Sequence, residues 1–502
     1  MEAFLGGLDL LLNWQVLAAV VIGSMGGVII GAIPGVGPPI AIAILLPVSF
    51  ALPPLVGLTM LLGIYGSSMY GGALPAILIN TPGTPVNALT TYDGYPLTQK
   101  GEAGRALKLA YSASLFGGLF SIACFVLMAP MLAWIAPQFG SREIFLAALL
   151  GVIMVVFAHR NQMLAAGMLT AFGIFLSTIG LDTTSYTMRF TFGQSWLVSG
   201  VDLIVVTTGL FALSQAFVLL VDKDEDFRPE PIKGSLFGGL GEILRHKRVA
   251  SIAAGCGTVM GIMPGVGEFT AQFLSYTYAR RTSKTPEAFG KGSPEGLIAS
   301  ESANNAVPVA ATIPLLALGI PGEALTAMML SVFYVHNVVP GPQLFQSHMD
   351  FVMALYIALF AINIIVFLFL LSTTNLLLKV LQIPTRLLGV FIFLLGFVGV
   401  YTLRNSINDC IIAAAFGVLG VILRRLDQPI VPIILGMVLG NIMEVKLRSA
   451  MPRIDGPLDF VNRPIAAIIF AIIVFVIARQ IRATYLNWRD GHQATKDHSR
   501  QG

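Results

Sequence analysis

The chain has 502 residues, of which 56% are hydrophobic and 11% are charged, and its formal net charge is +4. So few polar residues cannot coat a water-soluble globule of this length, and the composition therefore indicates a protein that crosses a lipid bilayer many times. The basic residues lie in loops and near the C-terminal end rather than in one stripe, which excludes a nucleic-acid-binding surface.

Apolar stretches close to the ~20 residues that a membrane-spanning helix needs recur along the whole chain. They lie near 14–33, 54–78, 107–136, 143–158, 163–181, 200–221, 249–263, 297–320, 323–339, 350–372, 386–402, 407–423, 429–443 and 464–482. Several are short or contain prolines. We therefore expect an all-α polytopic membrane protein with about twelve transmembrane helices plus re-entrant Pro-Gly hairpins.

The largest polar interruption is "DKDEDFRPEPIKGSLFGGLGEILRHKR", residues 222–248, which divides the chain almost in half. We interpret it as a polar linker between a first transmembrane half, 1–221, and a second, 249–482. Residues 483–502 then form a polar C-terminal tail.

The two halves contain matching motifs. Six residues recur at a constant offset of 230, namely Gly27, Gly31, Pro34, Gly35, Val36 and Gly37 against Gly257, Gly261, Pro264, Gly265, Val266 and Gly267. A second pair, "PAILINTPG" (75–83) and "PLLALGIPG" (314–322), follows at an offset of 239. Such matches predict two repeated halves, each with two helix breaks inside apolar sequence.

A broken helix in hydrocarbon exposes backbone groups at a cost of several kcal/mol each, roughly, unless protein or a water-filled site satisfies them. Helix starts at such breaks favour a carboxylate, and unwound carbonyls favour a cation such as Na⁺. The pattern therefore predicts a transporter site. For a single Pro-Gly, close packing at small residues or an ordinary loop end is the alternative interpretation.

Polar residues gather beside the breaks. Asn80 and Thr81 adjoin the second break of the first half, and Glu301, Asn304 and Asn305 lie in "ASESANNAVP" (299–308). Acids at membrane depth are functional candidates, because an ionised group there costs roughly 3 kcal/mol on insertion scales. Asp93, Glu268, Glu301 and Glu323 are thus candidate coupling-ion residues, with helix capping or exposure to water as the alternative for Asp93 and Glu301.

Several motifs together resemble one family. "GAIPGVGPPIAIAILLP", "MYGGALPAILINTPGTP", "DGYPLTQKGEAGRAL", "PGVGEFTAQFLSY", "FGKGSPEGLIASESANNA" and "LGIPGEALTAMML" stand in the order found in the large membrane subunit of the tripartite tricarboxylate transporters, the TctA family. The similarity runs from about residue 20 to 345 and continues more loosely beyond.

The resemblance implies a multi-pass subunit in the bacterial inner membrane that imports small carboxylates with a small membrane subunit and a periplasmic solute-binding protein. It implies no cofactor beyond Na⁺ or H⁺ as the coupling ion. Carried onto this sequence, the site elements that it implies are Pro34, Gly35, Gly37, Asn80, Thr81, Pro82, Gly83, Asp93, Pro264, Gly265, Gly267, Glu301, Asn304, Asn305, Pro321 and Gly322. Of these, all but Pro34, Pro264, Asp93 and Glu301 are candidate substrate-binding residues. Glu268 and Glu323 stand where the pattern has small neutral residues, and extra acids disfavour citrate.

Two other classes of protein are weighed against a coupled importer. A membrane enzyme would need a paired nucleophile and base or a metal set, and the three cysteines and six histidines show no ligand spacing. A channel, or a permease for organic anions that needs no binding protein, would share the hairpins. For the importer we expect the halves to superpose, with opposite orientations and converging Pro-Gly-Val-Gly segments.

Overall fold

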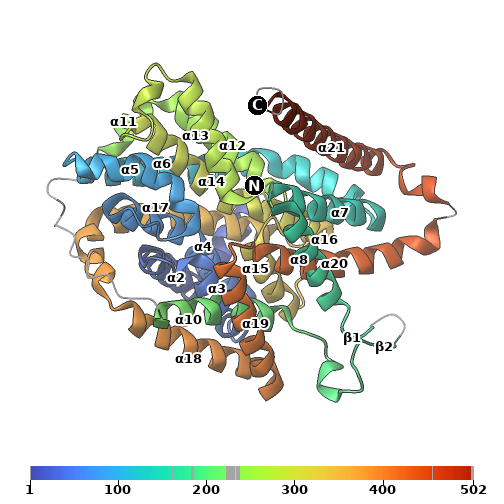
Figure 1. Cartoon of the computed structure of the whole chain (residues 1–502). Helices are drawn as coiled ribbons and strands as arrows, with labels where there is room; N and C mark the ends of the chain where they lie inside the picture. Colours follow the sequence, from blue (N-terminus) through green and yellow to red (C-terminus); the bar gives the residue numbers. More distant parts are fainter. Residues whose placement is uncertain are drawn as a thin grey trace.

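The structure is a computed structural model that describes residues 2–159, 162–182, 186–221, 232, 238–454 and 456–498, with side chains up to 482 except at 85, 129, 130, 133, 457 and 458. Figure 1 shows a bundle of helices with the long α21 on its outside. Nine helices of the described residues are long and apolar enough to cross a membrane. The one sheet described there pairs two-residue strands. These observations confirm the predicted all-α polytopic membrane fold.

The elements before the predicted linker are α1 (Glu2–Leu11), α2 (Trp14–Ala32), α3 (Gly37–Phe50), α4 (Pro54–Ile79), η1 (Pro85–Asn87), α5 (Ala88–Gln99), α6 (Ala103–Ile135), η2 (Ala136–Gln138), α7 (Ser141–Ala158), α8 (Met163–Ser177), β1 (Gly180–Leu181), β2 (Met188–Arg189), η4 (Ser195–Leu197), α9 (Leu203–Thr207), the π-helical η5 (Thr208–Leu213) and α10 (Ser214–Val221).

The elements after it are α11 (Gly239–Arg245), α12 (Lys247–Ile262), α13 (Gly267–Thr282), η6 (Pro286–Ala288), α14 (Pro294–Leu318), α15 (Ala324–Val335), α16 (Pro342–Ser347), α17 (Met349–Leu377), η7 (Val380–Gln382), α18 (Thr385–Arg404), α19 (Ile407–Arg425), α20 (Val431–Ala450), η8 (Met451–Arg453), η9 (Pro457–Phe460) and α21 (Pro464–His498).

Most of the predicted linker lies outside the described residues, but its end forms α11. This short helix packs on α6, as α1 packs on α17. The sequences of α1 and α11 share a short motif, since "GGL" occurs at residues 6–8 and again at 238–240. The second copy is hard to recognise because it lies in the polar segment. A Cβ on Gly7 would meet the Ala354 backbone, and one on Gly239 would meet the Lys108 backbone, so each helix approaches its neighbour at a glycine.

The two halves are interleaved. In the first half α2 packs on α4, and in the second half α12 packs on α14. The later helices pack on the opposite half, since α7 and α8 contact α20, while α18 and α19 contact η5 and α10. Each half therefore covers part of the other. The α2–α4 contact of the first half corresponds to the α12–α14 contact of the second, as the repeat in the sequence predicts.

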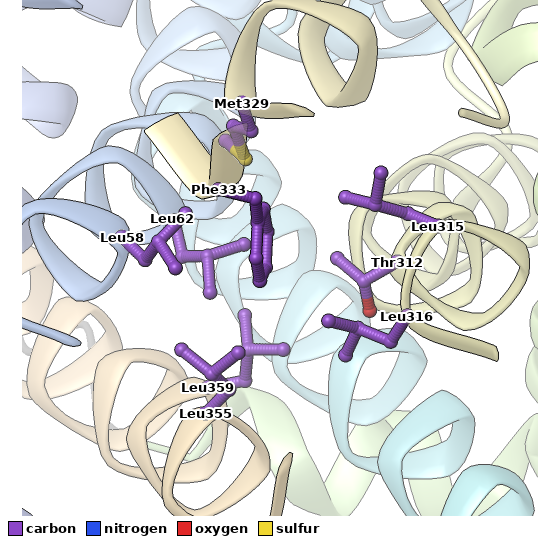
Figure 2. A pocket seen from close by; sticks show the side chains of 9 residues that line it. All are labelled: Leu58, Leu62, Thr312, Leu315, Leu316, Met329, Phe333, Leu355 and Leu359. Carbon is purple, nitrogen blue, oxygen red and sulfur yellow. The ribbon is translucent and has the colours of Figure 1, made fainter. Parts of the chain in front are cut away.

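The core where α4, α14, α15 and α17 meet is close-packed. Figure 2 shows Phe333 from α15 pointing between Leu58 and Leu62 on one side and Leu315 and Leu316 on the other. The void that these helices leave has a volume of about 10 Å³. That is barely one water molecule, so this junction is a rigid apolar support rather than a ligand site.

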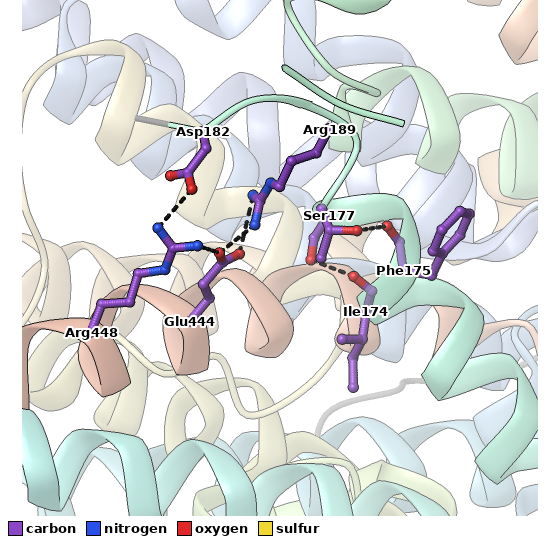
Figure 3. A network of polar contacts seen from close by, with 8 residues as sticks. Ile174, Phe175, Ser177, Asp182, Arg189, Glu444 and Arg448 are labelled. Atoms are coloured by element: carbon purple, nitrogen blue, oxygen red, sulfur yellow. Dashed lines mark hydrogen bonds and ion pairs between the residues drawn. The ribbon is translucent and has the colours of Figure 1, made fainter. Parts of the chain in front are cut away.

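A hairpin between α8 and α9 carries the short strands, with Gly180 opposite Arg189. Ion pairs fix it to α20, as Figure 3 shows: Arg448 bonds Asp182 at 2.7 Å and Glu444 at 2.7 Å, and Glu444 also accepts from Arg189. Strong hydrogen bonds of Arg189 to Glu444 raise the pKa of that guanidinium, so the group stays charged at any physiological pH.

Candidate functional site

The first pair of breaks has nearly the same backbone in both halves. Gly35 and Gly37 have φ of +78° and +56°, and their counterparts Gly265 and Gly267 have +78° and +68°. A residue with a Cβ is strained in this left-handed region, which explains why glycine stands at all four positions. The chain reverses here between α2 and α3 and between α12 and α13. With 14 residues, α3 spans about 21 Å at 1.5 Å per residue, short of the ~30 Å hydrocarbon core.

The second pair of breaks also matches. Asn80 ends α4 with φ +58°, and Gly319 ends α14 with φ +71°. The next residue in each half donates its N–H to a carbonyl inside the preceding helix, Thr81 to Pro75 at 3.4 Å and Ile320 to Pro314 at 3.2 Å. Both helices therefore stop at the residue that the repeat aligns.

In each half the two breaks touch. Gly83 leaves no room for a side chain, since a Cβ there would lie 2.1 Å from the Gly31 carbonyl oxygen and 2.7 Å from Gly72. In the second half Gly265 donates its N–H to the carbonyl of Gly322 at 2.7 Å. Pro82 and Pro321 precede these glycines. The loops that the sequence nominates are thus brought together in pairs.

Glu301 lies at the centre of a polar cluster between α5, α6 and α14. It is fully buried, and its carboxylate accepts hydrogen bonds from the hydroxyls of Thr90 and of Ser114, the latter at 2.8 Å. The amides of Asn87 and Asn305 also approach it, each at 3.5 Å. All four donors are neutral, so no cationic side chain of the described residues balances this carboxylate.

Further buried amides on α13 and α14 have no hydrogen-bond partner among the described residues. Both amide atoms of Asn304 and of Gln272 lack one, as do Asn305 Oδ1 and Ser300 Oγ. All four side chains are at most 3% exposed. A buried polar group without a partner costs roughly 1–3 kcal/mol, so these atoms are well suited to bind an ion, a water molecule or a substrate group.

Glu268 lies in the first turn of α13, directly after the second Pro-Gly-Val-Gly segment. It is 7% exposed, and its Oε1 accepts a hydrogen bond from the Tyr65 hydroxyl at 3.1 Å. Tyr65 is on α4 of the first half. This contact joins the hairpin of one half to the broken helix of the other.

The contacts of Asp93 indicate a structural role. Its Oδ1 accepts from the backbone N–H groups of Gly290, Gly292 and Ser293 at 2.7–2.9 Å, and Oδ2 accepts from Tyr276 at 2.9 Å. Burial raises the pKa of this carboxyl, and these hydrogen bonds oppose the rise. These hydrogen bonds join Asp93 on α5 to the loop before α14.

Glu323 is the N-cap residue of α15, and its own N–H donates to Thr326 Oγ1 at 3.0 Å. Its carboxylate oxygen Oε1 is buried without a partner among the described residues. Glu323 thus combines a helix-start position with one oxygen left for a ligand.

Asn80 and Thr81 lie apart from the buried cluster. Both are exposed, and the Thr81 hydroxyl donates to the nearby Ile79 carbonyl at 3.3 Å. The site residues that sequence reasoning missed are Tyr65, Ser114 and Gln272. Gln272 could have been found, because it follows Glu268 by four residues and so shares its helix face. Tyr65 and Ser114 are single polar residues in apolar runs and gave no such signal.

Repeated broken helices around buried acids define a membrane transport protein with internal repeats. Comparison with known proteins gives the particular group. The chain belongs to the tripartite tricarboxylate transporter TctA family, whose model matches residues 17–435. It is therefore a multi-pass membrane protein and a component of a tricarboxylate transporter. The TctA family is a family of transport proteins rather than of enzymes. The resemblance drawn from the motifs is confirmed.

Two curated relatives come from Agrobacterium vitis. The "uncharacterized 52.8 kDa protein in TAR-I ttuC' 3'region" is 34% identical over 470 residues, which cover 92% of this chain and 93% of the relative. The "uncharacterized protein in TAR-II ttuC' 3'region" is 35% identical over 212 residues, 42% of this chain and 88% of the relative. No solved structure matches the chain.

Proposed function

We propose that this chain is the large membrane subunit of a bacterial inner-membrane symporter that imports small carboxylates. A periplasmic solute-binding protein delivers the substrate, a small membrane subunit completes the complex, and Na⁺ or H⁺ supplies the driving force. Family membership supports the transporter, and the buried acids support the coupling.

The observation that carries the coupling is the environment of Glu301. A carboxylate with no exposed surface and only neutral donors is too costly to leave ionised and unbalanced. A proton or a bound cation removes that cost. Binding of the coupling ion at this carboxylate would therefore change the stability of the α5–α6–α14 junction, which is what an ion-driven transport cycle requires.

Glu268 is the second acid of this system. It lies between the hairpin of the second half and Tyr65 of the first half, so a change in its charge acts on the contact between the halves. The unpartnered amides of Asn304 and Gln272 on the adjoining helices supply neutral groups for a substrate carboxylate or for the ion. Neutral amides can serve either ligand, because each has both a donor and an acceptor.

Reconstitution into proteoliposomes tests the proposal. The complete system should concentrate a labelled carboxylate only under an inward Na⁺ or H⁺ gradient, and omission of the binding protein or of the small subunit should abolish uptake. Undiminished uptake by this chain alone would show a permease that needs no binding protein. Equilibration without accumulation, together with collapse of the gradient, would show a channel. Either result contradicts the proposal.

A further inference from the structure

A large cavity opens beside the first Pro-Gly-Val-Gly segment. Its volume is about 770 Å³, within the ~300–1,000 Å³ that small-molecule sites occupy. The hairpin contributes Gly35 to its wall, α10 contributes Gln215, and the end of α19 contributes Arg424 and Arg425. These residues come from both halves, so the cavity exists only because the halves are interleaved.

The side chains around Gly35 suit an anion. Arg424 Nε donates to Ser214 Oγ at 3.2 Å, which fixes the guanidinium at the cavity wall. No other hydrogen bond or ion pair joins the Arg424 side chain to the described residues, so its two terminal amino groups are left for a ligand. Gln215 is 6% exposed, and a Cβ on Gly35 would lie 3.0 Å from its Nε2. Asp427 also lines the cavity, but within the described part of the chain its carboxylate forms no ion pair with either arginine.

The two hairpins differ where a ligand would meet the helix start. In α3 the first residues after Gly37 are Pro38 and Pro39, which have no N–H to donate. The aligned position in α13 carries Glu268. An anion at the first hairpin therefore needs its donors from elsewhere, and Arg424 with Gln215 supplies them. The second hairpin carries an acid instead, which suits a cation or a proton.

We propose that Arg424, with Gln215 and the Gly35 backbone, binds a carboxylate group of the transported substrate at the first hairpin. The second hairpin carries Glu268, the second acid of the coupling system proposed above, so the two copies of the repeat serve the two ligands separately. The inference rests on the proposed function, because it assigns the substrate of that function to one cavity. A planar guanidinium matches a carboxylate with two parallel hydrogen bonds, which a lysine cannot reproduce.

Chemical protection tests the assignment without transport. Phenylglyoxal reacts with accessible arginines, and peptide mass spectrometry reports which ones. With the complete transporter in nanodiscs, citrate and succinate are each added as probes before labelling. We expect one of them to slow labelling of Arg424 at least tenfold and to leave the exposed Arg386 unchanged. Equal labelling of Arg424 with and without both probes overturns the inference.

Variants give the second measurement. For Arg424→Gln we expect the apparent KM for carboxylate uptake to rise about 10- to 100-fold, because the substrate carboxylate loses one charged hydrogen-bonding partner. Arg424→Lys should recover part of this rise, and Arg386→Gln should match the wild type. An unchanged KM in Arg424→Gln, with the wild type transporting normally, refutes the inference and leaves the proposed function standing.

A different result would contradict the proposed function itself. If the wild-type complex transports no carboxylate under any ion gradient, the proposed function is wrong, whatever the labelling of Arg424 shows. An anionic lipid headgroup is the competing occupant of the cavity. Labelling that is slowed by phosphatidylglycerol in the nanodisc, and not by either carboxylate, would assign Arg424 to lipid and overturn the inference.

Discussion

Glu301 offers the sharpest test of coupling, because its substitutions separate folding from ion binding. In Glu301→Ala the hydroxyls of Thr90 and Ser114 lose their acceptor in a fully buried place. At roughly 1–3 kcal/mol for each unpaired group, the loss is about 2–6 kcal/mol, a large share of the ~5–15 kcal/mol that holds a protein folded. We therefore expect Glu301→Ala to express poorly.

Glu301→Gln keeps the shape and one acceptor oxygen. The hydroxyl of Ser114 or Thr90 can rotate to accept from the new amide, so the expected cost is only about 1 kcal/mol and the protein should fold. The amide cannot take up a proton or balance Na⁺. Uptake by the reconstituted complex should then lose its dependence on the coupling gradient, and accumulation should fall about tenfold or more.

The matched control is Glu143→Gln. Glu143 is also fully buried, but it accepts from the Gly140 N–H at 2.8 Å and pairs with Arg463 at 3.2 Å, so it has a cationic partner. Its variant should keep the wild-type dependence on Na⁺ and pH, whatever it loses in stability. If Glu301→Gln accumulates carboxylate with the wild-type ion dependence, the coupling role of Glu301 is wrong.

Three more predictions concern the Tyr65–Glu268 contact, Asn304 and the packing of α2. Tyr65→Phe and Glu268→Gln should change the ion dependence of uptake in the same direction, because the two side chains share one hydrogen bond. A wild-type ion dependence in both variants would exclude this contact from coupling. Asn304→Ala should fold at least as well as the wild type, because its amide has no partner to lose among the described residues. It should raise the apparent KM, or the ion concentration for half-maximal uptake, about tenfold. Lower protein levels with normal kinetics would indicate a packing role. Gly31→Ala places a Cβ 2.2 Å from the Ser68 carbonyl oxygen and should lower the free energy of unfolding by about 1–3 kcal/mol or more. The control Gly26→Ala, on the same helix, meets nothing within 4 Å and should leave the melting temperature in detergent unchanged or higher.

The breaks in the helices were predictable from the sequence because glycine and proline act locally. The glycines of Pro-Gly-Val-Gly at 34–37 permit a left-handed backbone, and the repeat at 264–267 adopts nearly the same φ angles. The spans were predictable for a similar reason, since apolar length alone decides whether a helix can cross a bilayer. The membrane orientation of the halves stays a prediction.

The partners of the buried acids were not predictable, because they come from distant segments. Glu301 meets Thr90 from 211 positions earlier and Ser114 from 187 positions earlier, and no local pattern links them. Asp93 illustrates the same point from the other side. Its place beside a break makes it a coupling candidate, and the sequence gives no sign that the backbone of residues 290–293 donates three hydrogen bonds to its carboxylate. Only the tertiary contacts separate an acid that supports a loop from one that is left for an ion.

Under the proposed function, the divergence between the two hairpins explains how a duplicated element can serve a symporter. Two identical hairpins would offer the same helix start to the same ligand, and a substrate anion and a coupling cation would compete for unsuitable sites. Pro38 and Pro39 remove donors at the first hairpin, while Glu268 adds a negative charge at the second. Because α18 packs on α3 and the end of α19 lines the same cavity as Gly35, Arg424 can supply the positive charge that the prolines leave missing. The interleaved packing thus brings Arg424 of the second half to the hairpin of the first, and Tyr65 of the first half to Glu268 of the second.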